Sequence, residues 1–217
     1  QITKSYASGN KDYMFSLVFQ GSRLSFYMLL LLSMPIIFNA DFILEIWLKN
    51  VPEHTVVFVQ LILILAMSDS LSHTLVTSIL ANGNIKTYML VVGGLQLLNL
   101  PFNVILLYFD MSPYVIYIVA ITLSQICLLA RLLVLHKMMD LDVFKFAKSV
   151  YFNVLGVTLV ASILPIISKI YFPYGWISFF VVSIVSLVSV FTVVFFIGCD
   201  TTEQDFVKNK IRRFIFK

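Results

Sequence analysis

Six long hydrophobic stretches constrain this sequence more than any other feature. A helix needs roughly 20 mainly apolar residues to cross the hydrocarbon core of a bilayer, and six stretches meet that criterion. Turn-forming residues separate them, for example Asn-Gly-Asn at 82–84 and Pro-Tyr-Gly at 173–175. The expected spans are residues 24–44, 55–80, 87–109, 114–136, 149–172 and 176–199.

The composition agrees with a chain that lies in a membrane. Hydrophobic residues make up 60% of the sequence and charged residues 12%, whereas a soluble domain has about 45–50% and about 25%. Disorder, a main role in nucleic-acid binding and a compact cytosolic enzyme all fit this composition poorly. Backbone polar groups in lipid must be satisfied within the segment. We therefore predict an all-α integral membrane protein with a six-transmembrane-helix bundle over residues 24–199.

The basic residues predict the orientation of the bundle. If six spans alternate, all of the 15 lysines and arginines except Lys49 and Lys169 lie on one side of the membrane. The positive-inside rule makes that side the cytoplasm and places both ends of the chain there. Residues 1–23 are then an amphipathic cytoplasmic lead-in, and 200–217 a basic cytoplasmic tail. These segments and the linker 137–148 can lie along the anionic membrane surface or simply fix the orientation.

The second expected span carries an acidic residue at membrane depth. An isolated charge at the bilayer centre costs about 2.5–3.5 kcal/mol on insertion scales, so Asp69 requires a special environment. Ser72, His73 and Thr77 follow at helical spacing and are expected on the same side of the helix. Asp69 and His73 can form a proton- or cation-responsive pair lining a cavity. The alternative is an interhelical hydrogen-bond cluster.

Further polar residues lie in the third and fourth expected spans. Gln96, Asn99 and Asn103 share one helical face, where their amides can bridge helices or contact a hydroxyl-rich ligand. Arg131 can extend its side chain to the interface, or turn inward to meet a phosphate. Cys127 and Cys199 lie far apart and form no zinc pattern. With no glycine-rich phosphate loop either, we predict no nucleotide-driven motor, no metal and no cofactor.

Several short motifs, in order along the chain, resemble those of one family of membrane carriers. Residues 43–48 (Ile-Leu-Glu-Ile-Trp-Leu) and Val51-Pro52 resemble the apolar Leu-x-x-Trp-Leu that closes a helix in that family. Residues 81–88 (Ala-Asn-Gly-Asn-Ile-Lys-Thr-Tyr) are similar to its Ala-x-Gly-x-x-Lys-x-Tyr turn. Leu100-Pro101 and the charged tail also fit. The family is that of the Wzx-type flippases for O-antigen and capsule repeat units, within the multidrug/oligosaccharidyl-lipid/polysaccharide exporter superfamily.

The resemblance implies a transporter of the bacterial inner membrane. Such carriers have about twelve to fourteen spans in two bundles, and this chain resembles the C-terminal half. Because it begins with Gln1, we expect an N-terminal bundle to be missing. The implied cargo is an undecaprenyl-pyrophosphate-linked oligosaccharide, flipped to the periplasmic leaflet by alternating access within the lipid bilayer.

The resemblance also implies roles for the polar residues. Gln96, Asn99 and Asn103 would face the sugar, Arg131 would approach the pyrophosphate, and Asp69 with His73 would couple transport to H⁺ or Na⁺. The alternatives are a cation-coupled drug or small-molecule exporter of the same superfamily, a membrane-embedded enzyme acting on lipid-linked sugars, and a scaffold subunit. The partners expected here are lipids and ions, and nucleic acid is not among them.

Overall fold

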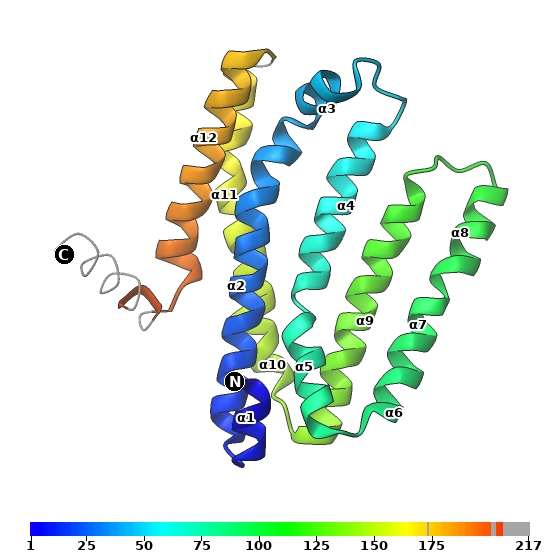
Figure 1. Cartoon of the computed structure of the whole chain (residues 1–217), viewed down its shortest axis with the longest axis vertical. Coiled ribbons are helices and arrows are strands. Elements are labelled where there is room, and N and C mark those ends of the chain that lie inside the picture. The colour runs from blue at the N-terminus through cyan, green and yellow to red at the C-terminus, as the bar shows by residue number, and fades with distance from the viewer. Residues whose placement is uncertain (173, 201–202, 206–217) are drawn as a thin grey trace.

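The computed structural model describes residues 1–172, 174–200 and 203–205, and within these ranges the chain is helical with no strand (Figure 1). The helical elements are α1 (Ile2–Ala7), α2 (Lys11–Phe38), α3 (Ala40–Leu48), α4 (Thr55–Ser70), α5 (His73–Asn82), α6 (Ile85–Tyr88), η1 (Met89–Gly93), α7 (Gly94–Leu97), α8 (Asn99–Tyr108), α9 (Val115–Met139), α10 (Val143–Phe146), η2 (Ala147–Tyr151), α11 (Phe152–Tyr171), α12 (Trp176–Val193) and η3 (Val194–Gly198). The three η elements are π-helical turns within longer helices.

Six helical stretches among the described residues are long and apolar enough to cross a membrane. They are Lys11–Phe38, Thr55–Asn82, Ile85–Tyr108, Val115–Met139, Val143–Tyr171 and Trp176–Gly198. The predicted all-α bundle of six spans is confirmed, and the chain is a multi-pass membrane protein.

The first span begins and ends earlier than the hydrophobic pattern predicts. Asn10 caps α2 by accepting a hydrogen bond from the backbone N–H of Tyr13 at 3.1 Å, so most of the expected lead-in belongs to the span. At the other end Asn39 interrupts the helix, and its side-chain amide donates to the carbonyl of Pro35 at 3.0 Å. The short helix α3 follows.

The expected linker 137–148 is also mostly helical. Only residues 140–142 separate α9 from α10, because Asp140 adopts a left-handed conformation with φ 63°. Asp142 then caps α10 by accepting from the backbone N–H of Lys145 at 2.9 Å. The expected basic tail 200–217 lies largely outside the described residues, which include only Asp200 and 203–205 of it.

The spans lie side by side in an open row rather than a closed ring (Figure 1). The packed pair α11 and α12 lies beside α2, then come α4–α5, α9 and finally the span α6–α8. Only 6% of the most apolar window of α6–α8 is buried, so this span packs on α9 and leaves its other faces open.

The hydrophobic core is concentrated at the end of the bundle where α2 begins, called here the N-terminal end. Met14 and Val18 of α2 are completely buried there against Leu75 of α5, Leu135 of α9 and Phe146 of α10. At the opposite end α8 and α9 leave an apolar groove of about 500 Å³ between them, lined by residues such as Phe102 and Met111. The apolar core is therefore densest at the N-terminal end of the bundle.

Aromatic side chains mark the opposite end of the bundle as a membrane interface. Trp47 at the end of α3 and Trp176 at the start of α12 are exposed. The ring of Phe42 makes an edge-to-face contact with Trp176, with centroids 5.2 Å apart. Tryptophan and tyrosine are enriched where hydrocarbon meets water, so this belt agrees with a transmembrane bundle.

Close packing of α2 against α5 predicts that alanine substitutions at two helical glycines change the free energy of unfolding in opposite directions. A Cβ atom on Gly21 would lie 2.8 Å from the methyl group of Thr74, whose hydroxyl is bonded to the carbonyl of Val18. Gly21→Ala should lower the free energy of unfolding by about 1–3 kcal/mol through overpacking. Nothing lies within 4 Å of a Cβ on Gly156, so Gly156→Ala should raise it by about 0.5–1 kcal/mol. Thermal unfolding in detergent checks this, and shifts of the same sign would contradict it.

Candidate functional site

A polar cavity of about 240 Å³ lies inside the membrane-spanning region, between α4, α7–α8 and α9. It collects four of the residues predicted from the sequence, namely Asp69, Gln96, Asn99 and Arg131. The remaining lining residues are Leu65, Ala120, Leu123, Ser124 and Cys127. The cavity therefore offers one acidic group, one basic group and two amides to a ligand within the bilayer.

The side chain of Asp69 is bound from the facing helix α9. Its carboxylate accepts a hydrogen bond from the Ser124 hydroxyl, with the two oxygens 2.5 Å apart. No ion pair to Asp69 exists among the described residues. Asp69 is thus exposed towards the cavity, with a hydrogen-bond donor but no cation beside it.

The hydrogen bond to Asp69 is the last link of a chain that begins on the fifth span. The hydroxyl of Tyr151 donates to the side-chain oxygen of Gln125 at 3.0 Å, and the Gln125 amide donates to the Ser68 hydroxyl at 2.5 Å. Ser68 and Ser124 are hydrogen bonded at 2.9 Å. Because Ser124 gives its proton to Asp69, Ser68 donates to Ser124, and every donor points towards the carboxylate.

Sequence reasoning missed Ser68, Ser124, Gln125 and Tyr151. Ser124 and Gln125 are adjacent polar residues within the apolar fourth span, and this was the signal that could have found them. Their partners lie on two other helices, so the sequence pattern alone could not join them.

Arg131 is buried in the wall of the cavity, with 6% of its surface exposed. One guanidinium nitrogen donates to the hydroxyl of Ser72 at 3.0 Å. Its Nε atom is buried with no hydrogen-bond partner, and no carboxylate pairs with it among the described residues. The side chain therefore lies inside the bundle, against the cavity. A buried guanidinium without a counter-ion is a strong attraction for an anion.

Two predicted site residues lie apart from the cavity lining. His73 is exposed and begins α5, because the helix is interrupted at Leu71 and Ser72 between α4 and α5. His73 does not line the cavity that Asp69 lines, and no hydrogen bond joins the two side chains among the described residues. Asn103 does not line the cavity either, but its amide donates to the side-chain oxygen of Asn99 at 3.0 Å and so orients it.

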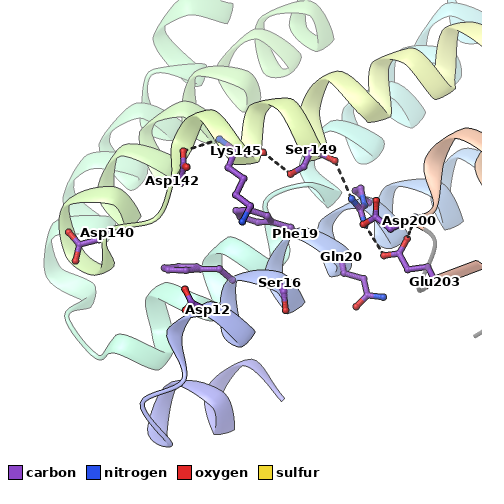
Figure 2. A pocket seen from close by; sticks show the side chains of 12 residues that line it. Asp12, Ser16, Phe19, Gln20, Asp140, Asp142, Lys145, Ser149, Asp200 and Glu203 are labelled. Atoms are coloured by element: carbon purple, nitrogen blue, oxygen red, sulfur yellow. Dashed lines mark hydrogen bonds and ion pairs between the residues drawn. The ribbon is translucent and has the colours of Figure 1, made fainter.

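A second, larger pocket of about 560 Å³ opens at the N-terminal end of the bundle (Figure 2). Acidic side chains dominate its lining: Asp12, Asp140 and Asp142 lie at one end, and Asp200 and Glu203 at the other. These acids come from three segments far apart in the chain, so the sequence pattern did not indicate that they share a pocket. No group of three or more histidine, cysteine or acidic residues in the described part of the chain could hold a metal ion.

A buried arginine, Arg23, also lines this second pocket. Arg23 of α2 is 5% exposed, and one of its nitrogens lies 2.5 Å from Asp200 and 2.8 Å from Glu203. Its other terminal nitrogen donates to the backbone carbonyl of Ser149 at 3.4 Å. This arginine, unlike Arg131, is neutralised within the chain.

Comparisons of the chain with protein-family models, with curated proteins and with solved structures find no match. The sequence and the geometry of the two pockets therefore carry the functional argument.

The hydrogen-bond chain predicts a large cost for removing Ser124. Ser124→Ala removes the donor to Asp69 and the acceptor for the Ser68 hydroxyl, and it should lower the free energy of unfolding by about 1–3 kcal/mol. Ser162→Ala is the matched control, because the half-buried Ser162 bonds only to the Leu159 carbonyl of its own helix, and it should change the free energy of unfolding by less than about 0.5 kcal/mol. Thermal unfolding in detergent measures both. Equal shifts would contradict the hydrogen-bond chain.

Proposed function

We propose that this chain is the C-terminal half of a carrier that flips an undecaprenyl-pyrophosphate-linked oligosaccharide across the bacterial inner membrane, for O-antigen or capsule synthesis. The observation that carries the proposal is the membrane-embedded cavity, in which the unpaired guanidinium of Arg131 lies with the amides of Gln96 and Asn99. This is a binding function, and we propose no covalent chemistry.

The proposed carrier lowers a solvation barrier. Removing water from the charges and hydroxyls of a sugar-pyrophosphate headgroup is prohibitive in hydrocarbon. A polar seam between helices that opens to each side in turn replaces those water contacts. The cavity supplies groups of the right kind at membrane depth, on helices that pack loosely at one end.

Each polar residue of the cavity suits one part of such a cargo. Arg131 presents a planar fork of N–H donors, which matches phosphate oxygens. Gln96 and Asn99 both donate and accept hydrogen bonds, as sugar hydroxyls require, and Asn103 orients Asn99. Asp69 suits a coupling cation, H⁺ or Na⁺, whereas the position of His73 outside the cavity gives it no part in this arrangement.

The apolar groove between α8 and α9 supports a cargo with a lipid tail. Leu123 lines both the groove and the polar cavity, so the two are neighbours on α9. A polyprenyl chain in the groove would keep its contact with hydrocarbon while the headgroup occupies the cavity. A purely hydrophilic substrate would leave the groove without a role.

The open face of α6–α8 is the proposed contact surface of the missing N-terminal bundle. This span is almost unburied within the chain, although it supplies Gln96 and Asn99. A second bundle facing it would complete the cavity wall. The distribution of basic residues supports a cytoplasmic location for the N-terminal end of the bundle and for both ends of the chain.

One observation favours a second candidate, a cation-coupled drug or small-molecule exporter. Asp69 lines the cavity without a cationic partner, and a positively charged compound could pair with it. In that case Asp69 would be the principal binding residue and Arg131 would be unfavourable.

The test replaces charged groups in the complete gene product, in host cells that lack the natural copy. Arg131→Met should lower surface polysaccharide at least tenfold while lipid-linked repeat units accumulate, because the pyrophosphate loses its partner. Since Arg131 has no ion pair to lose, the variant should still reach the membrane in normal amount. Arg131→Lys should retain more activity than Arg131→Met.

Asp69→Asn should also reduce surface polysaccharide, by loss of coupling. Its matched control is Asp110→Asn in the loop after α8, which should have no effect. Normal polysaccharide in the Arg131→Met strain would contradict the proposal. Sensitivity to cationic drugs in the Asp69→Asn strain, with polysaccharide intact, would establish the exporter instead.

A further inference from the structure

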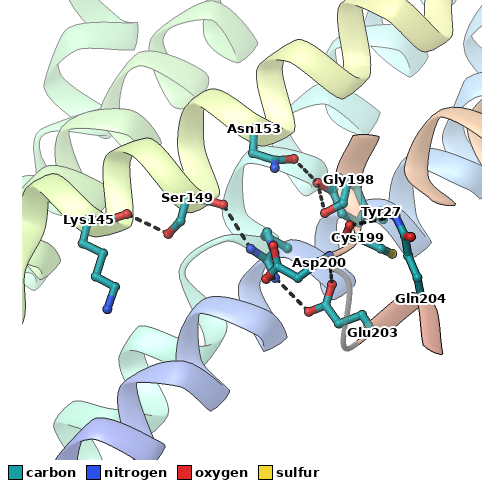
Figure 3. A network of polar contacts seen from close by, with 10 residues as sticks. Tyr27, Lys145, Ser149, Asn153, Gly198, Cys199, Asp200, Glu203 and Gln204 are labelled. Atoms are coloured by element: carbon teal, nitrogen blue, oxygen red, sulfur yellow. Dashed lines mark hydrogen bonds and ion pairs between the residues drawn. The ribbon is translucent and has the colours of Figure 1, made fainter. Parts of the chain in front are cut away.

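The end of the last span is held to the first span by a buried charge cluster (Figure 3). Arg23 on α2 pairs with Asp200 and Glu203, which lie 177 and 180 residues away along the chain. Glu203 also accepts a hydrogen bond from the backbone N–H of Asp200 at 2.9 Å. This bond holds the two acidic residues together beside Arg23. Charge-assisted pairs of this kind are stronger than neutral hydrogen bonds.

Neutral contacts next to the charge cluster hold the same elements. The hydroxyl of Tyr27 donates to the side chain of Asn153 on α11 at 2.6 Å. A Cβ on Gly198 would lie 2.9 Å from the Tyr27 ring, so only glycine permits this approach. Gln204 donates to the backbone carbonyls of Phe195 and Cys199 at the end of the span, at 2.9 and 3.3 Å.

The cluster lies at the boundary between the protein interior and water. The side chain of Glu203 is 8% exposed and that of Asp200 is 61% exposed. Both acids line the 560 Å³ pocket (Figure 2), and Arg23 lines it too. If Asp200 and Glu203 moved outward, the Glu203 carboxylate would enter water and the Arg23 guanidinium would lose both of its charged partners, without unfolding of any span.

The π-helical turn η2 connects this cluster to the membrane cavity. The Ser149 carbonyl of the turn accepts from Arg23, and Tyr151 of the same turn begins the hydrogen-bond chain to Asp69. Turns of the π type inside helices recur at functional sites. A displacement at Arg23 can therefore reach Tyr151 within one turn of helix.

We infer that Arg23, Asp200 and Glu203 form a releasable latch that holds the end of the last span against α2 and η2. When the latch is formed, Arg23 binds Asp200, Glu203 and the Ser149 carbonyl of η2 together. When it is released, Asp200 and Glu203 move away from Arg23, the 560 Å³ pocket widens, and η2 is free to move. The inference concerns this chain's own closure and holds whatever the cargo is.

Cys199 reports on the latch directly, because it lies between Gly198 and Asp200 and is half-buried. In a Cys127→Ser background it is the only cysteine of the chain. A membrane-impermeant maleimide is added to the complete protein in membranes, from each side in turn, and the labelling rate of Cys199 is measured. Glu203→Gln should raise this rate at least fivefold, from one side only. The control Asp205→Asn, at an exposed position with no ion pair to another described residue, should stay within twofold.

A charge-preserving variant separates release from a simple change in thiol reactivity. Burial, with a further effect of the Glu203 carboxylate, raises the pKa of the Cys199 thiol, so Glu203→Gln alone could speed labelling. Glu203→Asp keeps the charge but shortens the reach to Arg23, and it should also raise the rate at least fivefold.

Three results would overturn the latch. The first is an unchanged labelling rate of Cys199 in both Glu203 variants, and the second is an increase in Glu203→Gln alone. The third is an increase in the labelling rate together with a fall of more than about ten degrees in melting temperature, because such a fall marks a permanent structural contact. If the Glu203 variants fail to accumulate, Asp200→Asn at the exposed position is judged by the same thresholds.

Discussion

Hydrocarbon does not solvate charge, so each buried arginine of this bundle needs a polar or charged partner. The two buried arginines differ in the partners that they have. Arg23 is neutralised by Asp200 and Glu203 at the N-terminal end, and this pairing joins the first span to the last. Arg131 has only the hydroxyl of Ser72 as a partner. A buried cation without a counter-ion is costly, so the Arg131 position makes physical sense when an anionic ligand visits the cavity.

The packing of the six spans gives these two charges different surroundings. Tight apolar contacts close the bundle around α2 at the N-terminal end, whereas α6–α8 lies at the edge with little burial. The polar cavity and the apolar groove lie on that looser side. The turn η2 lies between the latch and the hydrogen-bond chain. Its Ser149 carbonyl accepts from Arg23, and its Tyr151 hydroxyl begins the chain that ends at Asp69.

Much of the fold could be predicted from the sequence because span length and hydrophobicity are local properties. Helical spacing and membrane depth selected Asp69, Gln96, Asn99 and Arg131 separately, and the structure places all four around one cavity. His73 and Asn103, selected in the same way, do not line that cavity. The latch and the hydrogen-bond chain could not be predicted, since each joins residues that only tertiary packing brings together. The early start of α2 depended on one cap, Asn10.

The central claim is that a water-accessible seam lies inside the membrane-spanning region, and cysteine accessibility in the complete protein tests it most directly. In a background without Cys127 and Cys199, Asn99→Cys should react with an aqueous maleimide at least tenfold faster than Leu100→Cys, its exposed apolar neighbour on the same helix. Soluble anionic sugar phosphate should slow that reaction. Equal, slow labelling at both positions from either side of the membrane would contradict the account.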